Sequence, residues 1–534
     1  MTIYENPDIC LISLPSRAHS TRPPLGLMTI CSYLERHGIK VELIDLKVKD
    51  LKIIELGSPK AKELEKTILD MLRQLKPAIV GMGTYTHEVG YTLEFAQKIK
   101  NAIDTTIIVG GQHSSLAPDD FIFEKSPIDF AVVGEGEETF RELTRAVLDH
   151  APRADFSQIR SSVFWNDGQL VRTPLRPLIE PLDEVPMPAY ERVDMDFYTQ
   201  PNPYAIRYVP LSSMYVFASR GCPARCTFCA IPSVWRYNET KKPIRFRSAK
   251  AVVDEVEHLV TNYGVDAIYF YDDDFCVWKQ HVIEICQEMI NRKLKLVWGC
   301  ETRVDKVDEE LLTWMQNAGC IQIDFGVESG SQRMLDAVNK NCKVEHIYSA
   351  FALCHKLGIR TFANMMYNLP GETEEDVRLN QELMQVIKPT VVSFGLMTPY
   401  PGSELYDALS SGKEDYHFFK EAEWKMPPKF VVAKHGLDLD TLVSEDTVRF
   451  NSFLSPVGPL PSFRKVMAQL LRSTRKKEYA HSVYTLGKFM IFDRLPRMIS
   501  KNVSPYGNQS TRAIVAVPTP AVSTNDQPVI VSGK

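Results

Sequence analysis

The chain of 534 residues carries a net charge of −5, and 24% of its residues are charged. Its length predicts two or three domains, and its slightly acidic balance gives no reason to expect nucleic-acid binding and favours a small-molecule partner. The 11 cysteines and the absence of a signal-peptide pattern predict a reducing, cytoplasmic location without disulfides. Because no apolar run approaches the roughly 20 residues that span a bilayer, contact with a membrane is expected to be peripheral at most.

Residues 1–150 alternate short apolar strands with amphipathic helices. Strands are expected in DICLISLP, KVELIDL, PAIVGMG, TTIIVGG and DFAVVGEGE, and helices are expected to begin near Leu25, Ala61, His87, Pro118 and Glu138. This alternation predicts a doubly wound parallel sheet of the Rossmann or flavodoxin type, which binds its ligand beyond the carboxyl ends of the strands. Glycines at these ends either make tight turns or let the backbone approach a large flat ligand. Their repetition favours binding by Gly110, Gly111, Gly134 and Gly136.

A proline-rich segment, residues 151–207, lacks sustained periodicity and is predicted to be a linker. Residues 208–412 then repeat strand and helix, with strands expected in MYVFAS, AIYFYDDD, LVWGC, CIQIDFGVE, RTFANMMYN and VVSFGLMTP. Six parallel repeats predict a second α/β unit in the form of a partial (β/α)6 barrel. The chemistry of such a barrel lies at the carboxyl ends of its strands.

The stretch SRGCPARCTFCAIP, residues 219–232, places Cys222, Cys226 and Cys229 in one loop after the first barrel strand. A structural zinc site needs four protein ligands, and no fourth cysteine or histidine lies nearby at a suitable spacing. Buried core positions account for isolated cysteines such as Cys10 or Cys31, but a loop rich in Gly, Pro, Arg and Thr is not a core. Three thiolates on a four-iron cluster leave one iron open to a substrate or cofactor, and we favour this interpretation.

This loop, C-x3-C-x2-C with Phe228 before the last cysteine, resembles the cluster loop of the radical S-adenosylmethionine (SAM) enzymes. The stretches YDDDF, ETRVD, FGVESGS, NLPGET and TPYPGSELY, together with the N-terminal sheet, resemble the cobalamin-binding subgroup over roughly residues 8–410. The resemblance implies three cofactors, which are a [4Fe-4S] cluster, SAM and cobalamin. SAM would chelate the open iron through its amino and carboxylate groups and be cleaved to a 5'-deoxyadenosyl radical.

The resemblance also implies which residues surround SAM. Cys222, Cys226 and Cys229 would ligate the cluster. Asp272 and Asp273 would meet the SAM amino group, where a solvated acidic turn is the alternative. Arg303 would pair with the methionine carboxylate through a charge-assisted bond or form a structural ion pair with Glu328. The expected SAM-binding residues are therefore Phe228, Asp272, Asp273, Arg303, Glu328 and Ser329, and no further catalytic residue is assigned.

The N-terminal sheet departs from the Asp-x-His-x-x-Gly signature that supplies a lower histidine ligand to cobalt in many cobalamin domains. The corresponding loop, SLPSRAHSTRPPLG, contains His19 without the aspartate and glycine, and His87 is the other candidate. We expect cobalt without a protein ligand on its lower face. The resemblance places the nucleotide tail of cobalamin against Gly110, Gly111, Gln112 and His113, with Gly134, Glu135 and Gly136 as the companion loop.

Residues 413–503 are expected to be helical, with the basic residues Arg464, Lys465, Arg472, Arg475, Lys476 and Lys477. A solvated helix face is the favoured interpretation, and a membrane-surface or substrate-covering helix is the alternative. Residues 504–534 are rich in Pro, Ser and Thr and are expected to be disordered.

Three functions are compatible with these features. The first is a methyltransferase that acts on an unactivated carbon of a small-molecule or lipid-like substrate. The second is a radical cyclase or rearrangement enzyme similar to the anaerobic porphyrin-ester cyclase, and the third is a non-catalytic cobalamin or iron-sulfur carrier. We favour the methyltransferase, with an electron donor such as flavodoxin or ferredoxin as its partner.

Overall fold

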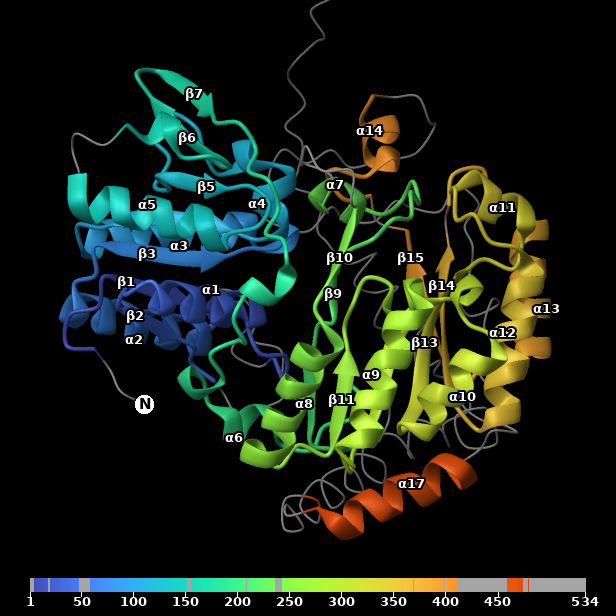
Figure 1. Cartoon of the computed structure of the whole chain (residues 1–534). Coiled ribbons are helices and arrows are strands. Elements are labelled where there is room, and N and C mark those ends of the chain that lie inside the picture. The colour runs from blue at the N-terminus through green and yellow to red at the C-terminus, as the bar shows by residue number, and fades with distance from the viewer. Residues whose placement is uncertain are drawn as a thin grey trace, which may run out of the picture.

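The computed structural model contains two α/β units that are joined by a crossing segment (Figure 1). It describes residues 4–17, 20–47, 58–150, 155–207, 209–235, 243–367, 369–397, 399–411, 459–473 and 479. No helix in these ranges is long and apolar enough to cross a membrane.

The first unit confirms the predicted parallel sheet. Its five parallel strands are β1 (Ile9–Ile12), β2 (Val41–Ile44), β3 (Ile79–Gly83), β4 (Thr106–Gly110) and β5 (Phe130–Val132), in the order β2-β1-β3-β4-β5. The helices that pack around it are α1 (Leu25–Arg36), α2 (Pro59–Leu75), α3 (Val89–Ala102), α4 (Gln112–Leu116) and α5 (Glu137–His150). Where a helix was expected near Pro118, only a short turn, Pro118–Asp120, follows α4.

The segment predicted as a linker is more ordered than expected. Strands β6 (Ser162–Asn166) and β7 (Gln169–Arg172) add an antiparallel hairpin to the β5 edge of the first sheet. Further on, Tyr190 and Tyr198 are fully buried, and Tyr198 lies on the short helix α6 (Met195–Tyr198). Proline-rich composition concealed these elements, because their stability comes from contacts with the sheet and not from local periodicity.

The second unit confirms the predicted six parallel strands. They are β8 (Ser213–Val216), β11 (Ala267–Phe270), β12 (Val297–Arg303), β13 (Cys320–Glu328), β14 (Arg360–Tyr367) and β15 (Val391–Leu396), in the order β15-β14-β13-β12-β11-β8. The helices α8 (Ala249–Tyr263), α9 (Lys279–Asn291), α10 (Glu309–Asn317), α12 (Val344–Leu357) and α13 (Glu374–Ile387) accompany these strands. Within the described residues, β8 and β15 are the two free edges, so the barrel is open.

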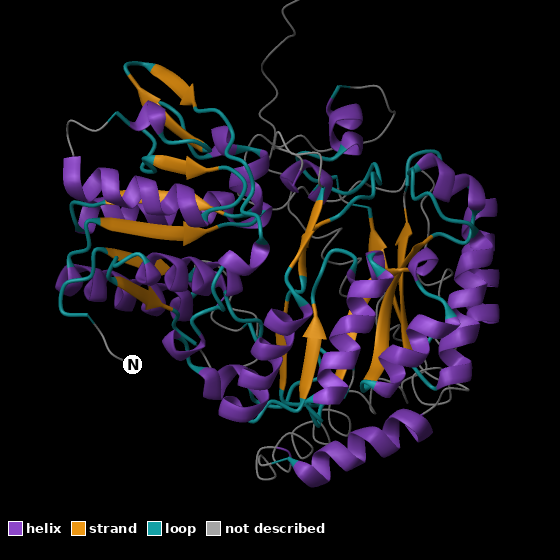
Figure 2. Ribbon diagram, viewed as in Figure 1, coloured by secondary structure: helices purple, strands orange, loops and turns teal. Residues whose placement is uncertain are grey.

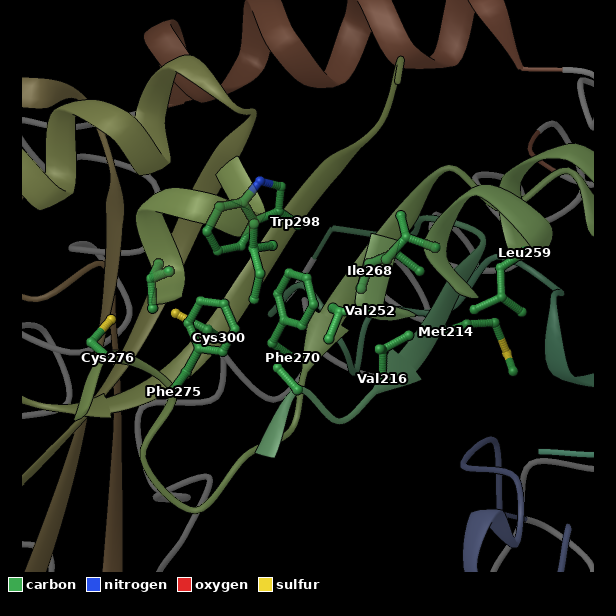
Figure 3. Close-up of a cluster of buried hydrophobic side chains, with 14 of the residues drawn as sticks. Met214, Val216, Val252, Leu259, Ile268, Phe270, Phe275, Cys276, Trp298 and Cys300 are labelled. Carbon is green, nitrogen blue, oxygen red and sulfur yellow. The ribbon is translucent and has the colours of Figure 1, made fainter. Parts of the chain in front are cut away.

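Successive residues of each barrel strand face opposite sides of the sheet. On the helix side the side chains are apolar, as Figure 3 shows for Phe270, Phe275 and Trp298. The rings of Phe270 and Trp298 meet edge to face at 5.3 Å, and Trp298 is 0% exposed. The inner side instead carries polar groups such as Glu301 and Asp324, which are paired in register on β12 and β13. The apolar layer fixes the strands, and the polar face is left to line the barrel.

Helix α17 (Pro459–Arg472) lies below the amino-terminal ends of the barrel strands, at the opposite end from the short helix α7 (Ile231–Trp235) that follows the cysteine loop (Figure 1). The buried carboxylate of Asp266 accepts hydrogen bonds from Gln469 (2.9 Å), Ser473 (2.8 Å) and Tyr479 (2.7 Å). The expectation of a solvated basic face is wrong for Lys465, which donates to the Gln316 carbonyl at 3.0 Å. This helix therefore closes the base of the barrel.

Most of the predicted C-terminal region cannot be compared with its expected structure. Arg475, Lys476, Lys477 and the whole expected tail, residues 504–534, lie outside the described residues. Within residues 413–503 only residues 459–473 and 479 are described.

The two sheets are oriented so that their functional ends approach each other. Figure 2 shows the strands of the first sheet pointing toward the barrel, whose own strands point toward the edge that carries the cysteine loop. Arg22, in the loop after β1, reaches across to Tyr271 after β11, and its Nη1 donates to the tyrosine hydroxyl at 2.8 Å. The carboxyl ends of both sheets, where parallel sheets bind ligands, therefore border a shared region.

Candidate active site

The cysteine loop follows β9 (Ser219–Gly221), which pairs with β10 (Ile244–Phe246) in an antiparallel hairpin. The backbone N–H of Cys229 donates to the Cys226 carbonyl at 3.1 Å, and the N–H of Thr227 donates to the Val338 carbonyl at 3.0 Å. These bonds form a turn that contains Cys226 and Cys229 and fix it against the segment around Val338. Burial raises the pKa of Cys222 to about 11 and that of Cys229 to about 12.

The donor set of this loop fits a four-iron cluster. In the described part of the chain, no three His, Cys, Asp or Glu side chains are arranged around one metal position. Cluster thiolates do not need such an arrangement, because each binds a different iron. Iron would also keep the thiols deprotonated despite their raised pKa values, as metal coordination does.

The three aspartates after β11 differ in what they contact. Asp272 is buried and accepts hydrogen bonds from the Ser219 hydroxyl (2.5 Å) and the Ala218 N–H (3.1 Å), and burial raises its pKa to about 7. Asp274 is also buried, and its Oδ2 has no hydrogen-bond partner among the described residues. Asp273 is exposed and accepts from the Trp235 indole at 3.1 Å. Asp272 therefore holds the cysteine hairpin, and Asp273 is the accessible carboxylate of the pair named in the sequence analysis.

Arg303, at the end of β12, directly contacts the cysteine loop. Its Nη1 lies 3.7 Å from the Cys226 sulfur, and its Nε donates to Asp305 at 2.8 Å. Glu328 is not its partner, so the structural ion pair considered as an alternative does not form in this structure. The Nη2 of Arg303 donates to the Lys340 and Asn341 carbonyls, so the buried guanidinium is fixed beside a predicted cluster ligand.

Lys340 is the residue that sequence reasoning missed. It is 5% exposed, and its ammonium pairs with Glu328 at 2.7 Å and lies 6.0 Å from the centre of the Phe228 ring. Nothing in the spacing of the sequence marks it, because it follows the short helix α11 (Gln332–Ala337) and reaches Glu328 only in the folded chain. A buried lysine needs a charged partner, and here that partner is a predicted SAM-binding residue.

Glu328 and Ser329 end β13 in an irregular conformation. Glu328 has a φ of 65°, and the register between β13 and β14 shifts between Gly326 and Glu328. Left-handed backbone at a residue other than glycine costs about 1–3 kcal/mol and is concentrated at ligand sites. Ser329 is fully buried, and its hydroxyl donates to Asn380 at 3.0 Å. Its role in this structure is to hold the bulge against α13.

Among the glycines of the expected cobalamin loops, Gly111 lies closest to another segment of the chain. It has a φ of +103°, and a Cβ there would lie 2.8 Å from the Thr84 carbonyl oxygen. Gly134 also has a positive φ of +78° with open space around it. For Gly136 a Cβ would lie 3.1 Å from Ile30, whereas Gly110 has ordinary space. Gly111 therefore makes a tight turn against the Thr84 backbone, whereas the backbone at Gly134 leaves room for a flat ligand to approach closely.

The polar residues expected near cobalamin have different environments. His113 is fully buried, and its ring nitrogens lie 3.2 Å from the Thr86 hydroxyl and 3.0 Å from Asp120. Gln112 begins α4. His87 is exposed and stacks on Tyr85, with ring centres 6.0 Å apart. Among the two histidines considered as cobalt ligands, His87 is thus accessible, and His19 lies outside the described residues.

The inner face of the barrel carries a polar set below the cysteine loop. Tyr269 donates to Asp324 at 2.8 Å and more weakly to Glu301 at 3.3 Å. Asp324 also pairs with Arg207 at 3.1 Å. No cation lies within ion-pair distance of Glu301 among the described residues, and burial, together with the neighbouring Asp324 carboxylate, raises its pKa to about 7.

Comparisons with known proteins agree with this arrangement. Residues 16–144 match the B12 binding domain, and residues 216–383 match the radical SAM superfamily. The chain belongs to the cobalamin-binding radical SAM enzymes. Its cofactors are accordingly a [4Fe-4S] cluster, SAM and cobalamin, and the cysteine loop and the glycine backbone described above fit them.

Relatives of this radical SAM enzyme differ in their reactions. An uncharacterized methyltransferase of Pyrococcus horikoshii is 29% identical over 73% of this chain and 78% of its own. The anaerobic magnesium-protoporphyrin IX monomethyl ester cyclase of Rubrivivax gelatinosus is also 29% identical, over 87% of this chain and 81% of its own. The methyltransferase TsrM of Kitasatospora setae, solved with cobalamin and a [4Fe-4S] cluster, has the same fold, with a TM-score of 0.59, 21% identity and coverage of 76% and 75%.

We predict that Cys226→Ala abolishes both the iron-sulfur cluster and SAM cleavage, because two thiolates are too few to hold a cluster with one open iron. Anaerobically reconstituted wild-type protein should contain about four irons per chain, as measured by iron analysis. Cys31→Ala removes a cysteine buried in the first unit and should retain both properties. Formation of 5'-deoxyadenosine by Cys226→Ala would contradict the assignment.

Gly111→Ala should eliminate tight cobalamin binding while leaving the cluster intact. The added Cβ would press on the Thr84 carbonyl and force a side chain into left-handed backbone, at a cost of about 1–3 kcal/mol. Absorbance after desalting measures both cofactors in one spectrum. Gly26→Ala is the matched control, because a Cβ there has nothing within 4 Å. Cobalamin retained at wild-type level in Gly111→Ala would show that this loop does not line the site.

The raised pKa of Glu301 predicts a pH effect on stability. Between the ordinary pKa of a glutamate and about 7, the folded cofactor-free protein binds more protons at this site than the unfolded chain. The free energy of unfolding contributed by this group therefore falls as pH rises through that window, by at most about 1.4 kcal/mol per pH unit. The free energy of unfolding can be measured by urea denaturation at several pH values. The difference in this free energy between the wild type and Glu301→Gln should show the fall. A difference that stays constant with pH would refute the prediction, and the exposed Glu94→Gln controls for the substitution.

Proposed function

We propose that this enzyme methylates an unactivated carbon of a small-molecule or lipid-like substrate. The observation that supports this most is the approach of the two cofactor-binding sheet ends, joined by the 2.8 Å hydrogen bond from Arg22 to Tyr271. In such a reaction one cofactor generates a radical on the substrate and the other donates the methyl group, so both must flank the same substrate. The methyltransferases among its relatives give the same preference.

Each cofactor supplies one part of this reaction. When bound, SAM on the cluster provides the radical that removes a substrate hydrogen, and cobalamin provides the methyl group. The chain positions these parts with residues of both units. Asp273 offers an accessible carboxylate to the SAM amino group, and Arg303, anchored by Asp305 at 2.8 Å, offers donors to its carboxylate.

The pair of Lys340 and Glu328 closes the other side of the SAM site in this proposal. The Lys340 ammonium is buried near the Phe228 ring, and separating it from Glu328 would leave an unpaired charge beside apolar groups. The pair therefore keeps the Glu328 carboxylate in one orientation, toward the ribose hydroxyls or the sulfonium.

A radical cyclase is the second candidate. It is favoured by the similarity to the Rubrivivax cyclase, which extends over 87% of this chain, whereas the Pyrococcus methyltransferase matches 73%. Either reaction needs a reduced cluster, so we infer a small electron-transfer protein such as flavodoxin or ferredoxin as partner.

Isotope transfer distinguishes the two candidates. Holoenzyme is incubated anaerobically with a reductant, SAM carrying a deuterated methyl group, and a small-molecule extract of the source cells. Methylation predicts a product with one additional, deuterated methyl group, and the product must be absent with Cys226→Ala. A new product without deuterium would identify the cyclase or a rearrangement instead. Formation of no 5'-deoxyadenosine would contradict both.

A further inference from the structure

Four charged side chains meet between the two units, and we call them the interdomain charge cluster: Glu135, Glu137, Arg220 and Arg245. Glu135 accepts from Arg220 at 2.7 Å and from both terminal nitrogens of Arg245 at 3.0 Å. Glu137 accepts from the other terminal nitrogen of Arg220 at 2.7 Å. The side chains of Glu135, Glu137 and Arg245 are only 3–5% exposed.

The interdomain charge cluster connects the two loops that are expected to hold cobalamin and the iron-sulfur cluster. Glu135 lies between Gly134 and Gly136 in the loop after β5, which is expected to contact cobalamin. Arg220 lies on β9, two residues before Cys222, and is paired in register with Arg245 on β10. The carboxylate expected near cobalamin is therefore fully used by the hairpin that begins the cysteine loop.

The hairpin is too tightly packed to absorb a shift of its arginines. Gly221, between Arg220 and Cys222, has a φ of +104°, and a Cβ there would lie 2.2 Å from the Pro243 carbonyl oxygen. Behind it, Asp272 accepts from the Ser219 hydroxyl at 2.5 Å. A displacement of Arg220 would therefore move Cys222 with it.

The first loop is fixed from its own side. The Ile179 N–H donates to Glu135 at 2.9 Å, and the Ile179 carbonyl accepts from Arg245 at 2.6 Å. The two guanidiniums, whose planar forks match carboxylates, hold the Glu135 pKa below its ordinary value although burial opposes this. Charges and donors are thus matched on both sides of the interface.

Such a buried set adds little to net stability, but it strongly disfavours any arrangement that separates its members. We propose that Glu135, Arg220 and Arg245 are positioning residues that fix the distance between the cobalamin loop and the cluster loop. The proposal rests on the two cofactor sites and not on the choice between methylation and cyclisation. Reacting centres held by separate domains need such a constraint, because small misplacements cost large factors in rate.

The test removes one matched charge pair and measures the geometry of the cofactors. In Glu135→Gln/Arg245→Gln the net charge is unchanged and no buried charge is added. We expect iron content within about twofold of wild type. In the molecules that hold cobalamin, the magnetic interaction between cob(II)alamin and the reduced iron-sulfur cluster should weaken severalfold, because local openings of a few kcal/mol become accessible. The readout is the relaxation enhancement of the cob(II)alamin paramagnetic resonance signal by the reduced cluster, which needs no substrate.

The neighbouring pair provides the control. Arg141 donates to Glu138 within α5, one residue from the interdomain charge cluster, so Glu138→Gln/Arg141→Gln makes the same chemical change inside one unit. It should keep the wild-type relaxation enhancement. Wild-type enhancement in Glu135→Gln/Arg245→Gln would overturn the proposal.

A second pair covers the case in which the first variant does not fold. Glu137→Gln/Arg220→Gln removes the other two charges of the interdomain charge cluster. It leaves the two hydrogen bonds from Arg245 to Glu135 in place. It should weaken the enhancement less than the first pair, with cobalamin still bound. Wild-type enhancement in this variant, with or without data from the first, would equally contradict a positioning role for Arg220.

Discussion

Pairing of buried charges is the constraint on which the site and the domain interface depend. Around the cysteine loop, Arg303 is matched by Asp305, Lys340 by Glu328, and Arg220 by two carboxylates of the other unit. An unpaired charge in this region would cost several kcal/mol. Each pair therefore selects one arrangement of the loops, and the loops in turn place the three thiols and the expected cofactor contacts.

Glu301 shows what happens where this pairing is incomplete. It faces Asp324 across the strand pair, and Asp324 is already matched by Arg207. With no cation at ion-pair distance in the described residues, burial raises its pKa to about 7. A carboxyl group in this state accepts or donates a hydrogen bond according to its protonation. The inner face thus combines fixed ion pairs near the cluster with one adaptable acid deeper in the barrel.

The sequence was sufficient to predict the elements that have a local signal. Alternating apolar segments predicted the five and six parallel strands of the two sheets. The spacing of Cys222, Cys226 and Cys229 carries the prediction of a cluster loop, which remains a prediction about those three residues. Glycines at strand ends also indicated backbone that other residues rarely adopt, as the φ of +103° at Gly111 shows. These features depend on period and residue type, which a single chain records.

Other features depend on contacts between distant segments, and the sequence contains no signal for them. Lys340 meets Glu328 only after α11 folds back, and Glu135 meets Arg220 only when the two units dock. Lys465 was expected in solvent because its neighbours are basic, yet it reaches the Gln316 carbonyl across the base of the barrel. The hairpin β6–β7 was missed for the same reason, since its pairing with β5 compensates for weak local propensity.

The relatives show that this scaffold does not determine the reaction. An uncharacterized methyltransferase and a cyclase are each 29% identical to this chain, and function is decided by the groups of a site and not by the fold that carries it. Beside the cysteine loop, Arg303, Lys340 and Arg220 are paired with carboxylates of the chain. The inner face is different, because in the described part of the chain no cation lies within ion-pair distance of Glu301, and Tyr269, which donates to it, stands beside the ring of Tyr271. Within the described barrel, this face therefore holds a buried carboxyl group that keeps hydrogen-bonding capacity for a further partner.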